Sequence, residues 1–231
     1  NKIGEGEAGR DGIAHITPNK PLPEGNVIAK ATDKAEHPNT SQPSDAKKAT
    51  DTTPPAKPVI TTDLTGKAGT TPTIDVTAEP GSKVELFDKD GHKLGEREAG
   101  RDGIAHITPN KPLPEGNVTA KATDKAEHPN TSQPSDAKKA TDTTPPAKPV
   151  ITTDLTGKAG TTPTIDVTAE PGSKVELFDK DGHKLGEREA GRDGIAHIPL
   201  TTPLPEGNVT AKATDKAEHP NTSQPSDAKK A

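Results

Sequence analysis

The feature that most constrains the fold of this chain is an internal repeat. The segment Asp51–Ile60 recurs at Asp142–Ile151, an offset of 91 residues (142 − 51). Residues 1–50 match 92–141 at the same offset, with a few changes. A unit of this length is too long for a helical solenoid repeat, but it suits a bead-like domain of roughly 100 residues.

The repeat divides the chain into three expected regions. The two complete units are nearly identical: within the aligned residues, only Thr108–Lys111 is replaced, by Pro199–Thr202. We therefore expect the following organisation: the C-terminal half of a repeat in residues 1–50, one full repeat in 51–141 and another in 142–231.

Each unit has the pattern of a chain made of short β-strands. Apolar and polar residues alternate, and turn signals rich in Gly, Pro, Asn and Asp separate the alternating segments, which is typical of a β-sandwich. No window has apolar residues at helical spacing. In the first full unit we expect strands at Ala56–Ile60, Thr73–Ala78, Lys83–Phe87, His92–Glu98, Ile104–Ile107, Asn117–Thr123 and Ser135–Ala140.

The core of such a unit must be thin and aliphatic. Only 26% of the residues are hydrophobic and the only aromatic residues are two phenylalanines. This composition also fits a disordered chain, but the net charge of −5 is small for one and the apolar residues alternate between well-formed turns. A folded sandwich is therefore the preferred interpretation, with a core of Val59, Ile74, Val76, Val84, Leu86, Leu94, Ile107, Leu113, Val118, Ala120 and Ala122.

Several classes of function lack their signals. The chain has no cysteine, so thiolate catalysis and zinc–thiolate sites are excluded. It has no phosphate-binding glycine loop, nucleophile elbow or zinc-protease motif, so we expect no enzyme. Basic and acidic residues are interspersed without stacking aromatics, which argues against nucleic-acid binding. No apolar run is long enough to span a membrane.

A set of short segments resembles a known family. These are Asp51–Pro55, Ala78–Val84, Asp88–Gly91, Asp102–Ile104, Leu113–Gly116 and Ala120–Asp124. Together they resemble the bacterial Ig-like repeat that builds the stalks of large surface adhesins, including those of the staphylococcal biofilm-associated protein type. The resemblance covers the whole chain. It implies an Ig-like antiparallel β-sandwich, a tandem array and an extracellular location at the bacterial cell surface, with wall attachment through regions outside this segment.

The resemblance also raises the hypothesis of calcium between repeats. Carboxylates and amides that end a strand, lie in the next loop or open the linker could supply hard oxygen ligands for Ca²⁺. The candidate ligands are Asp33, Asn39, Asp51, Asp124, Asn130 and Asp142, with Asp215 and Asn221 as equivalents in the last unit. The alternative is that Asp142 caps a Thr143–Thr144 turn and Asp124 only ends a strand. Where relatives carry Asp-x-x-Gly-Asn, this chain has Asp124–Asn130 without the glycine.

Two further segments have a plain structural interpretation. Asp88–Gly91 has acidic residues at alternate positions, but glycine arrives too early for a calcium-binding EF-hand loop, so we expect a hairpin turn. The histidines have no metal-ligand spacing. The linker Thr141–Pro149 is rich in proline, which favours an extended and semi-rigid spacer.

The preferred functional hypothesis is a structural stalk whose partners are the neighbouring repeats of the same chain. A second hypothesis is a module that associates with its own kind between cells, through edge strands, in a biofilm. A third is a host-ligand-binding Ig-like domain. Residues 1–50 lack the first strands of their unit, so they could pack loosely, swap with a neighbouring chain or be the trimmed remainder of a longer segment.

Overall fold

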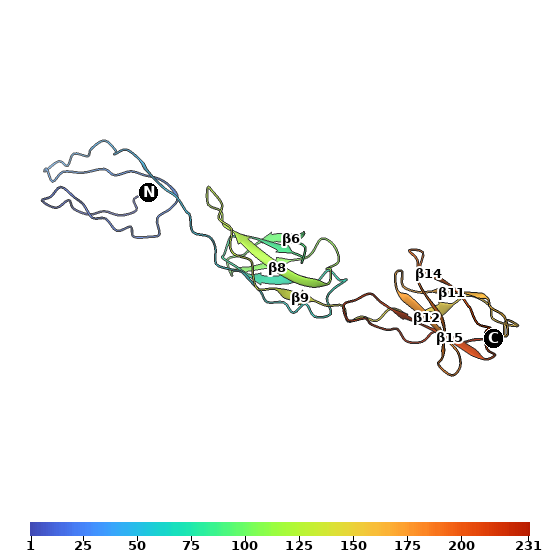
Figure 1. Ribbon diagram of the computed structural model, residues 1–231. Coiled ribbons are helices and arrows are strands. Elements are labelled where there is room, and N and C mark those ends of the chain that lie inside the picture. Colours follow the sequence, from blue (N-terminus) through green and yellow to red (C-terminus); the bar gives the residue numbers. More distant parts are fainter.

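The computed structural model describes residues 1–231, and it contains strands and turns but no helix. Figure 1 shows three lobes joined end to end, with the two chain ends in opposite outer lobes. Residues 1–50 form β1 (Gly25–Val27) and β2 (Lys47–Ala49). The next unit forms β3 (Val59–Ile60), β4 (Ile74–Thr77), β5 (Lys83–Phe87), β6 (Lys93–Glu98), β7 (Ile104–Ile107), β8 (Gly116–Thr123) and β9 (Lys138–Ala140). The last forms β10 (Val150–Ile151), β11 (Thr164–Thr168), β12 (Lys174–Phe178), β13 (Lys184–Glu189), β14 (Ile195–Pro199), β15 (Asn208–Thr214) and β16 (Lys229–Lys230).

Each full unit has two antiparallel sheets. In residues 51–141 the strand orders are β3-β4-β7 and β6-β5-β8-β9. The last unit repeats them as β10-β11-β14 and β13-β12-β15-β16. The expected fold class, an all-β tandem of Ig-like antiparallel sandwiches, is confirmed.

Two separate cores lie between the paired sheets. One holds 16 buried residues between Ile60 and Ala140, and the other holds 13 between Ile151 and Ala211. The alternation of β4, β5 and β8 places their apolar side chains inward, as predicted. Val59 is a wrong prediction: it is 55% exposed. Its neighbour Ile60 pairs beside the buried Val76 and points into the core instead.

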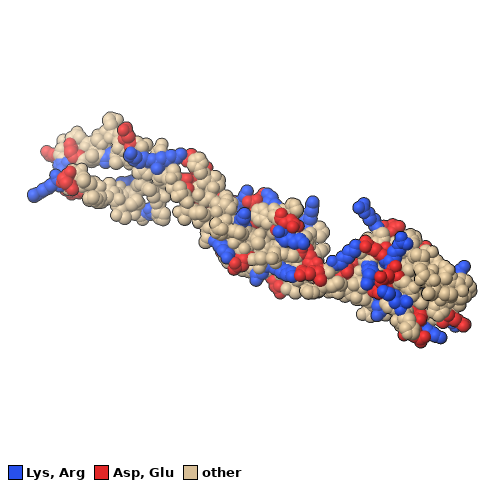
Figure 2. All heavy atoms as spheres, in the orientation of Figure 1, with Lys and Arg blue, Asp and Glu red and all other residues tan.

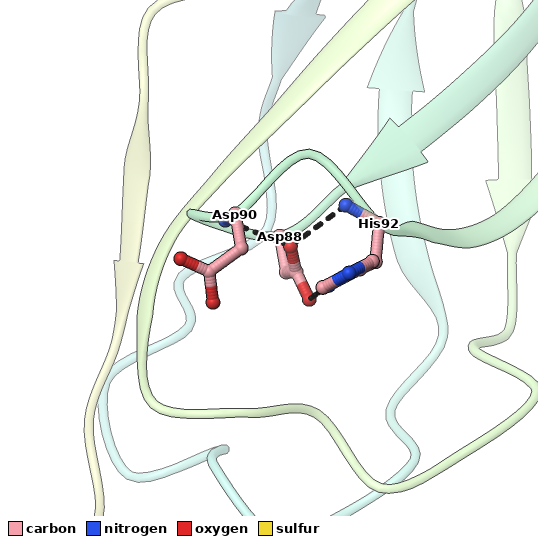
Figure 3. A group of neighbouring side chains, drawn as sticks. All are labelled: Asp88, Asp90 and His92. Carbon is pink, nitrogen blue, oxygen red and sulfur yellow. Dashed lines mark hydrogen bonds and ion pairs between the residues drawn. The ribbon is translucent and has the colours of Figure 1, made fainter.

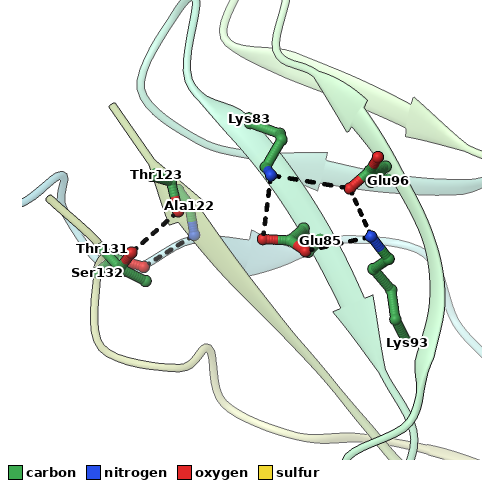
Figure 4. Close-up of polar contacts among 8 residues, drawn as sticks. All are labelled: Lys83, Glu85, Lys93, Glu96, Ala122, Thr123, Thr131 and Ser132. Carbon is green, nitrogen blue, oxygen red and sulfur yellow. Dashed lines mark hydrogen bonds and ion pairs between the residues drawn. The ribbon is translucent and has the colours of Figure 1, made fainter. Parts of the chain in front are cut away.

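The last strand is shorter than predicted because serine side chains replace part of its ladder. The hydroxyl of Ser135 accepts a hydrogen bond from the backbone N–H of Ala120 at 2.8 Å, and that of Ser132 accepts one from Ala122 at 2.9 Å. The same serines donate their own N–H groups back to the carbonyls of those alanines. Figure 4 shows the contact at Ser132. The chain therefore follows β8 well before β9 begins.

The proline-rich linker belongs partly to the unit that follows it. Pro146 and Pro149 are buried, as are their counterparts Pro55 and Pro58. Proline has no N–H to give to a sheet, so the first strand begins only after the last of these prolines. The linker is thus anchored on the downstream sandwich along part of its length.

Candidate functional site at the junctions between repeats

A closed loop follows the longest strand of every unit. We call residues 124–130 and 215–221 the junction loops. In the last unit, one carboxylate oxygen of Asp215 accepts backbone N–H groups from Asn221 at 2.8 Å and from Ala217 at 3.2 Å. The other oxygen accepts the side-chain amide of Asn221 at 3.0 Å. Aspartate thus fixes the loop by pairing with backbone donors that would otherwise face water.

The aspartate of the preceding junction loop makes the same contacts. Asp124 accepts the backbone N–H of Asn130 at 2.9 Å and its side-chain amide at 3.0 Å. The backbone N–H of Asn130 is the main reason why the pKa of Asp124 lies below its ordinary value. Asp124 therefore stays ionised well into the acid range.

Each junction loop reaches back to the start of the linker before it. The side-chain amide of Asn221 donates a hydrogen bond to the backbone carbonyl of Asp142 at 3.1 Å. Asn130 does the same to the carbonyl of Asp51 at 3.1 Å. In Figure 1 the dark-red hairpin after β15 extends toward the preceding green lobe.

A glutamate of the upstream unit holds the same loop from the other side. The carboxylate of Glu115 accepts the backbone N–H of Glu218, at 2.9 Å and 3.2 Å for its two oxygens. Lys139, in β9, pairs with the side chain of Glu218 at 2.9 Å. Through this hydrogen bond and its positive charge, Lys139 holds the pKa of Glu218 below its ordinary range.

The first junction repeats this arrangement. Glu24 accepts the backbone N–H of Glu127 at 2.9 Å and that of Asp51 at 3.2 Å. Lys48 pairs with Glu127 at 3.0 Å and lowers its pKa, through the same hydrogen bond and charge. Both junctions therefore use the same contacts between equivalent residues.

The structure brings some of the predicted calcium ligands together. Asp124, Asn130 and the backbone carbonyl of Asp51 meet at the first junction. The carboxylates of Asp51 and Asp142 do not take part in this contact. They accept hydrogen bonds from the N–H groups of Thr53 and Thr144, each at 2.9 Å. This matches the capping role considered as the alternative for Asp142.

The side-chain atoms that meet at the junction are arranged poorly for binding a cation. The nitrogen of the Asn130 amide, and not its oxygen, faces both Asp124 and the Asp51 carbonyl. Two acceptors fix that orientation, and the amide hydrogens fill the space where Ca²⁺ would need oxygen atoms. In residues 1–50 the pair Asp33 and Asn39 is bonded alike, at 2.9 Å. Calcium binding by these residues stays a prediction.

The sequence analysis did not identify Glu115, Lys139 or Glu218. Each is an ordinary charged residue of an exposed segment, and only the docking of two units gives it a partner. These residues are the equivalents of Glu24, Lys48 and Glu127 at the offset of 91. The recurrence does not mark them as contact residues, because nearly every residue of the unit recurs.

A second group of polar side chains lies at the turn between β5 and β6 (Figure 3). The expected hairpin turn is confirmed, with Gly91 at a φ of 83°. Asp88 accepts the N–H groups of Asp90 and His92, each at 2.9 Å. One ligand atom of each of these three residues lies within 4.8 Å of the others, and Asp179, Asp181 and His183 repeat the group. The three can therefore offer two carboxylates and one imidazole to an ion at an exposed turn.

A surface cavity also lies at a junction. It has a volume of about 450 Å³ and is lined by residues of both units, among them Leu22, Glu24 and Lys125. Leu22 is 50% exposed, whereas its equivalent Leu113 is 1% exposed. Leu22 therefore lines the cavity because the core of residues 1–50 is open.

Two general surface properties complete the description. Figure 2 shows lysine and arginine mixed with aspartate and glutamate over the visible face, without a large patch of one sign. The structure offers no helix with the length and apolarity needed to cross a lipid bilayer.

Comparisons with known proteins identify the fold. No family model matches the chain, and no curated protein matches it. A crystal structure of a tetra-tandem repeat in the extending region of a large adhesion protein is similar, with a TM-score of 0.52 and 21% identity over 96% of this chain. This chain spans 61% of the length of that structure.

A two-domain fibronectin type III segment of chicken tenascin has a TM-score of 0.46 and 14% identity, covering 77% of this chain and 99% of the segment. The BSP domain of a biofilm associated protein has a TM-score of 0.31 and 20% identity, covering 75% of this chain and 29% of that one. The first likeness establishes a tandem array of β-sandwiches as the fold.

Proposed function

We propose that this chain is a length of stalk in a bacterial surface adhesin, and that it holds a separate binding domain away from the cell. Each of the units 51–141 and 142–231 acts as one bead of that stalk. The observation that carries the proposal is the recurrence of the same contacts at both junctions, through Glu24 and Glu115 and their partners. The same contacts at each junction fix the same angle between neighbouring beads, so successive beads extend in a regular way.

The fold comparison supports this function. The similar structure comes from the extending region of a large adhesion protein. The present chain shares the features that extension requires: independent cores, linkers partly anchored on the following bead, and chain ends at opposite outer lobes (Figure 1). A stalk also accounts for the mixed surface charge, since a spacer needs solubility more than a ligand-binding patch.

Small-angle X-ray scattering tests the stalk directly. Chains with two, three and four tandem copies of the unit 142–231 are compared. We expect the maximum dimension to rise by the same increment with each added copy, because each junction adds one bead at a fixed angle. A maximum dimension that grows much more slowly than the copy number would contradict the proposal.

Analytical ultracentrifugation of the same proteins addresses the alternative of self-association between cells. A stalk bead stays monomeric over the accessible concentration range, with and without calcium. Concentration-dependent dimers would favour the self-associating module instead.

A calcium titration followed by calorimetry tests the predicted ligands Asp51, Asp124 and Asn130, since bound calcium would release measurable heat at one site per junction.

A further inference from the structure

We propose that a side-chain amide, and not a bound cation, ties each repeat to the one before it, through Asn130 at the first junction and Asn221 at the second. The inference rests on the proposed stalk function and names the contact that fixes the bead angle.

The amide nitrogen bridges an oxygen of its own loop and an oxygen at the start of the linker, directly after Thr141, whose backbone is hydrogen-bonded to Leu64 and Ala68 of the upstream bead. At the second junction, Asn221 donates one hydrogen to Asp215, within its own loop, and the other to the carbonyl of Asp142, where the linker begins. A cation at such a junction would join oxygen ligands of the same two kinds, a carboxylate and a backbone carbonyl. The amide makes the same link with two N–H groups, and both acceptors are satisfied by it.

The junction loop is preformed for this contact. In residues 1–50, the loop Asp33–Asn39 has the same internal hydrogen bonds, at 2.8 Å and 2.9 Å, although the printed sequence contains no linker for Asn39 to meet. The loop therefore does not depend on docking for its shape. Its second amide hydrogen is held ready for a carbonyl, so docking orders few additional groups.

The remaining contacts at the junction differ in their sensitivity to salt. The pair Lys139–Glu218 is about half exposed on each side, at 46% and 52%, so salt weakens it. The amide contact of Asn221 is made by a neutral donor and a neutral carbonyl, so salt screens it little. We therefore infer that the bead angle persists at high salt and in the presence of a chelator.

Distances between spin labels test the inference. The chain has no cysteine, so Arg101→Cys and Arg192→Cys place one label at equivalent exposed positions on each full unit. Pulsed electron–electron double resonance then gives the distribution of distances between the two labels across the second junction. For the otherwise unchanged chain we expect a narrow distribution that neither EDTA nor millimolar calcium alters.

The variant Asn221→Asp keeps the size of the side chain but removes both N–H donors, and it adds a negative charge beside Asp215. We expect it to broaden the distribution. Asn39→Asp makes the same change in residues 1–50, outside the labelled pair of units, so it controls for the substitution as such and should leave the distribution narrow. Circular dichroism confirms that both variants retain their sheets.

Two results would overturn the amide bridge. One is a distribution that stays narrow in Asn221→Asp. The other is a distribution in the unsubstituted junction that broadens with EDTA and narrows again with calcium, which needs no folding variant to observe. A broad distribution under all conditions would contradict the fixed-angle stalk as well, and the scattering series separates that failure from a failure of the bridge alone.

Discussion

Residues 1–50 and 92–141 have almost the same sequence but very different surroundings. In the full repeat, Ile107 and Leu113 are each 1% exposed. Their equivalents Ile16 and Leu22 are 45% and 50% exposed. The difference arises because β3, β4 and β5, which cover this face in the full repeat, have no counterpart ahead of residues 1–50 in the printed sequence.

The polar contacts of the two regions nevertheless agree. Ser41 and Ser44 accept backbone N–H groups from Ala31 and Ala29, each at 2.9 Å, as their equivalents do in the full repeat. Hydrogen bonds between residues close in sequence thus form in both regions. Burial requires the other half of the sandwich, so the comparison separates locally determined structure from structure that depends on distant segments.

The largest effect is expected from a core truncation made in both regions. Ile107→Ala removes buried methyl groups and leaves a cavity, so it should lower the free energy of unfolding of its repeat by about 2–5 kcal/mol. Urea denaturation followed by circular dichroism should then show this repeat unfolding ahead of the repeat 142–231. The matched Ile16→Ala removes an exposed side chain and should leave the transition unchanged. Equal effects at the two positions would mean that residues 1–50 bury Ile16 in solution.

A smaller effect is expected at the serines that replace part of the β9 ladder. Ser135→Ala leaves the backbone N–H of the buried Ala120 without its acceptor, which should cost about 1–3 kcal/mol in stability. The equivalent Ser44→Ala leaves the exposed backbone N–H of Ala29 free to bond to water, so it should change stability by less than about 0.5 kcal/mol. Amide hydrogen exchange at Ala120 and Ala29 measures both. Faster exchange at Ala29 alone would contradict this ranking.

Most strands of a full unit were predictable because they carry their own signal. Alternation in residues 73–78 and 117–123 places the buried side chains correctly, and Asp88–Gly91 forms the expected turn. Val59 was misplaced because a strand of two residues is too short for alternation to show which side chain faces the core. The position depends on the pairing of Ile60 with Val76, which joins distant segments.

The junction was predictable only in part. The sequence pattern singled out Asp124, at the end of a strand, and Asn130, in the following loop, as candidate calcium ligands, and the structure places their side chains together. Their partner at Asp51 is a backbone carbonyl, which no side-chain pattern reveals. The contact of Glu115 with a backbone N–H 103 residues away depends on how two folded units meet, and that lies beyond any local signal.

A still smaller effect is expected from the ion pairs on the outer face of β5 and β6 (Figure 4). Glu85 lies 3.5 Å from Lys93 and 3.8 Å from Lys83. Glu85→Gln should destabilise the repeat by less than about 1 kcal/mol, because both lysine partners are about half exposed and ion pairs with such partners contribute little. The difference should shrink further in 1 M salt. Residues 1–50 have no counterpart of Glu85, but Lys2 pairs there with Glu5, at the positions equivalent to Lys93 and Glu96, so Glu5→Gln is the control and should have no measurable effect on unfolding. A loss that salt does not reduce would point to packing by the Glu85 side chain instead.

The smallest effect concerns pH at the second junction. Lys139 lowers the pKa of Glu218 in the docked state. The contribution of the pair to docking is therefore fully present above the ordinary pKa of a glutamate, about 4.3, and is lost as pH falls through the lowered docked value. The label-to-label distribution across this junction should broaden slightly between pH 5 and pH 3.

Glu218→Gln removes the titrating group but keeps the backbone N–H that Glu115 accepts. It should give the slightly broader distribution already at neutral pH and should lose the part of the acid response that the pair contributes. Glu36→Gln alters the equivalent residue of residues 1–50, which has no upstream lysine in the printed sequence, and should preserve the response. If both variants broaden alike in acid, the ion pair of Lys139 with Glu218 does not account for the acid response of the junction.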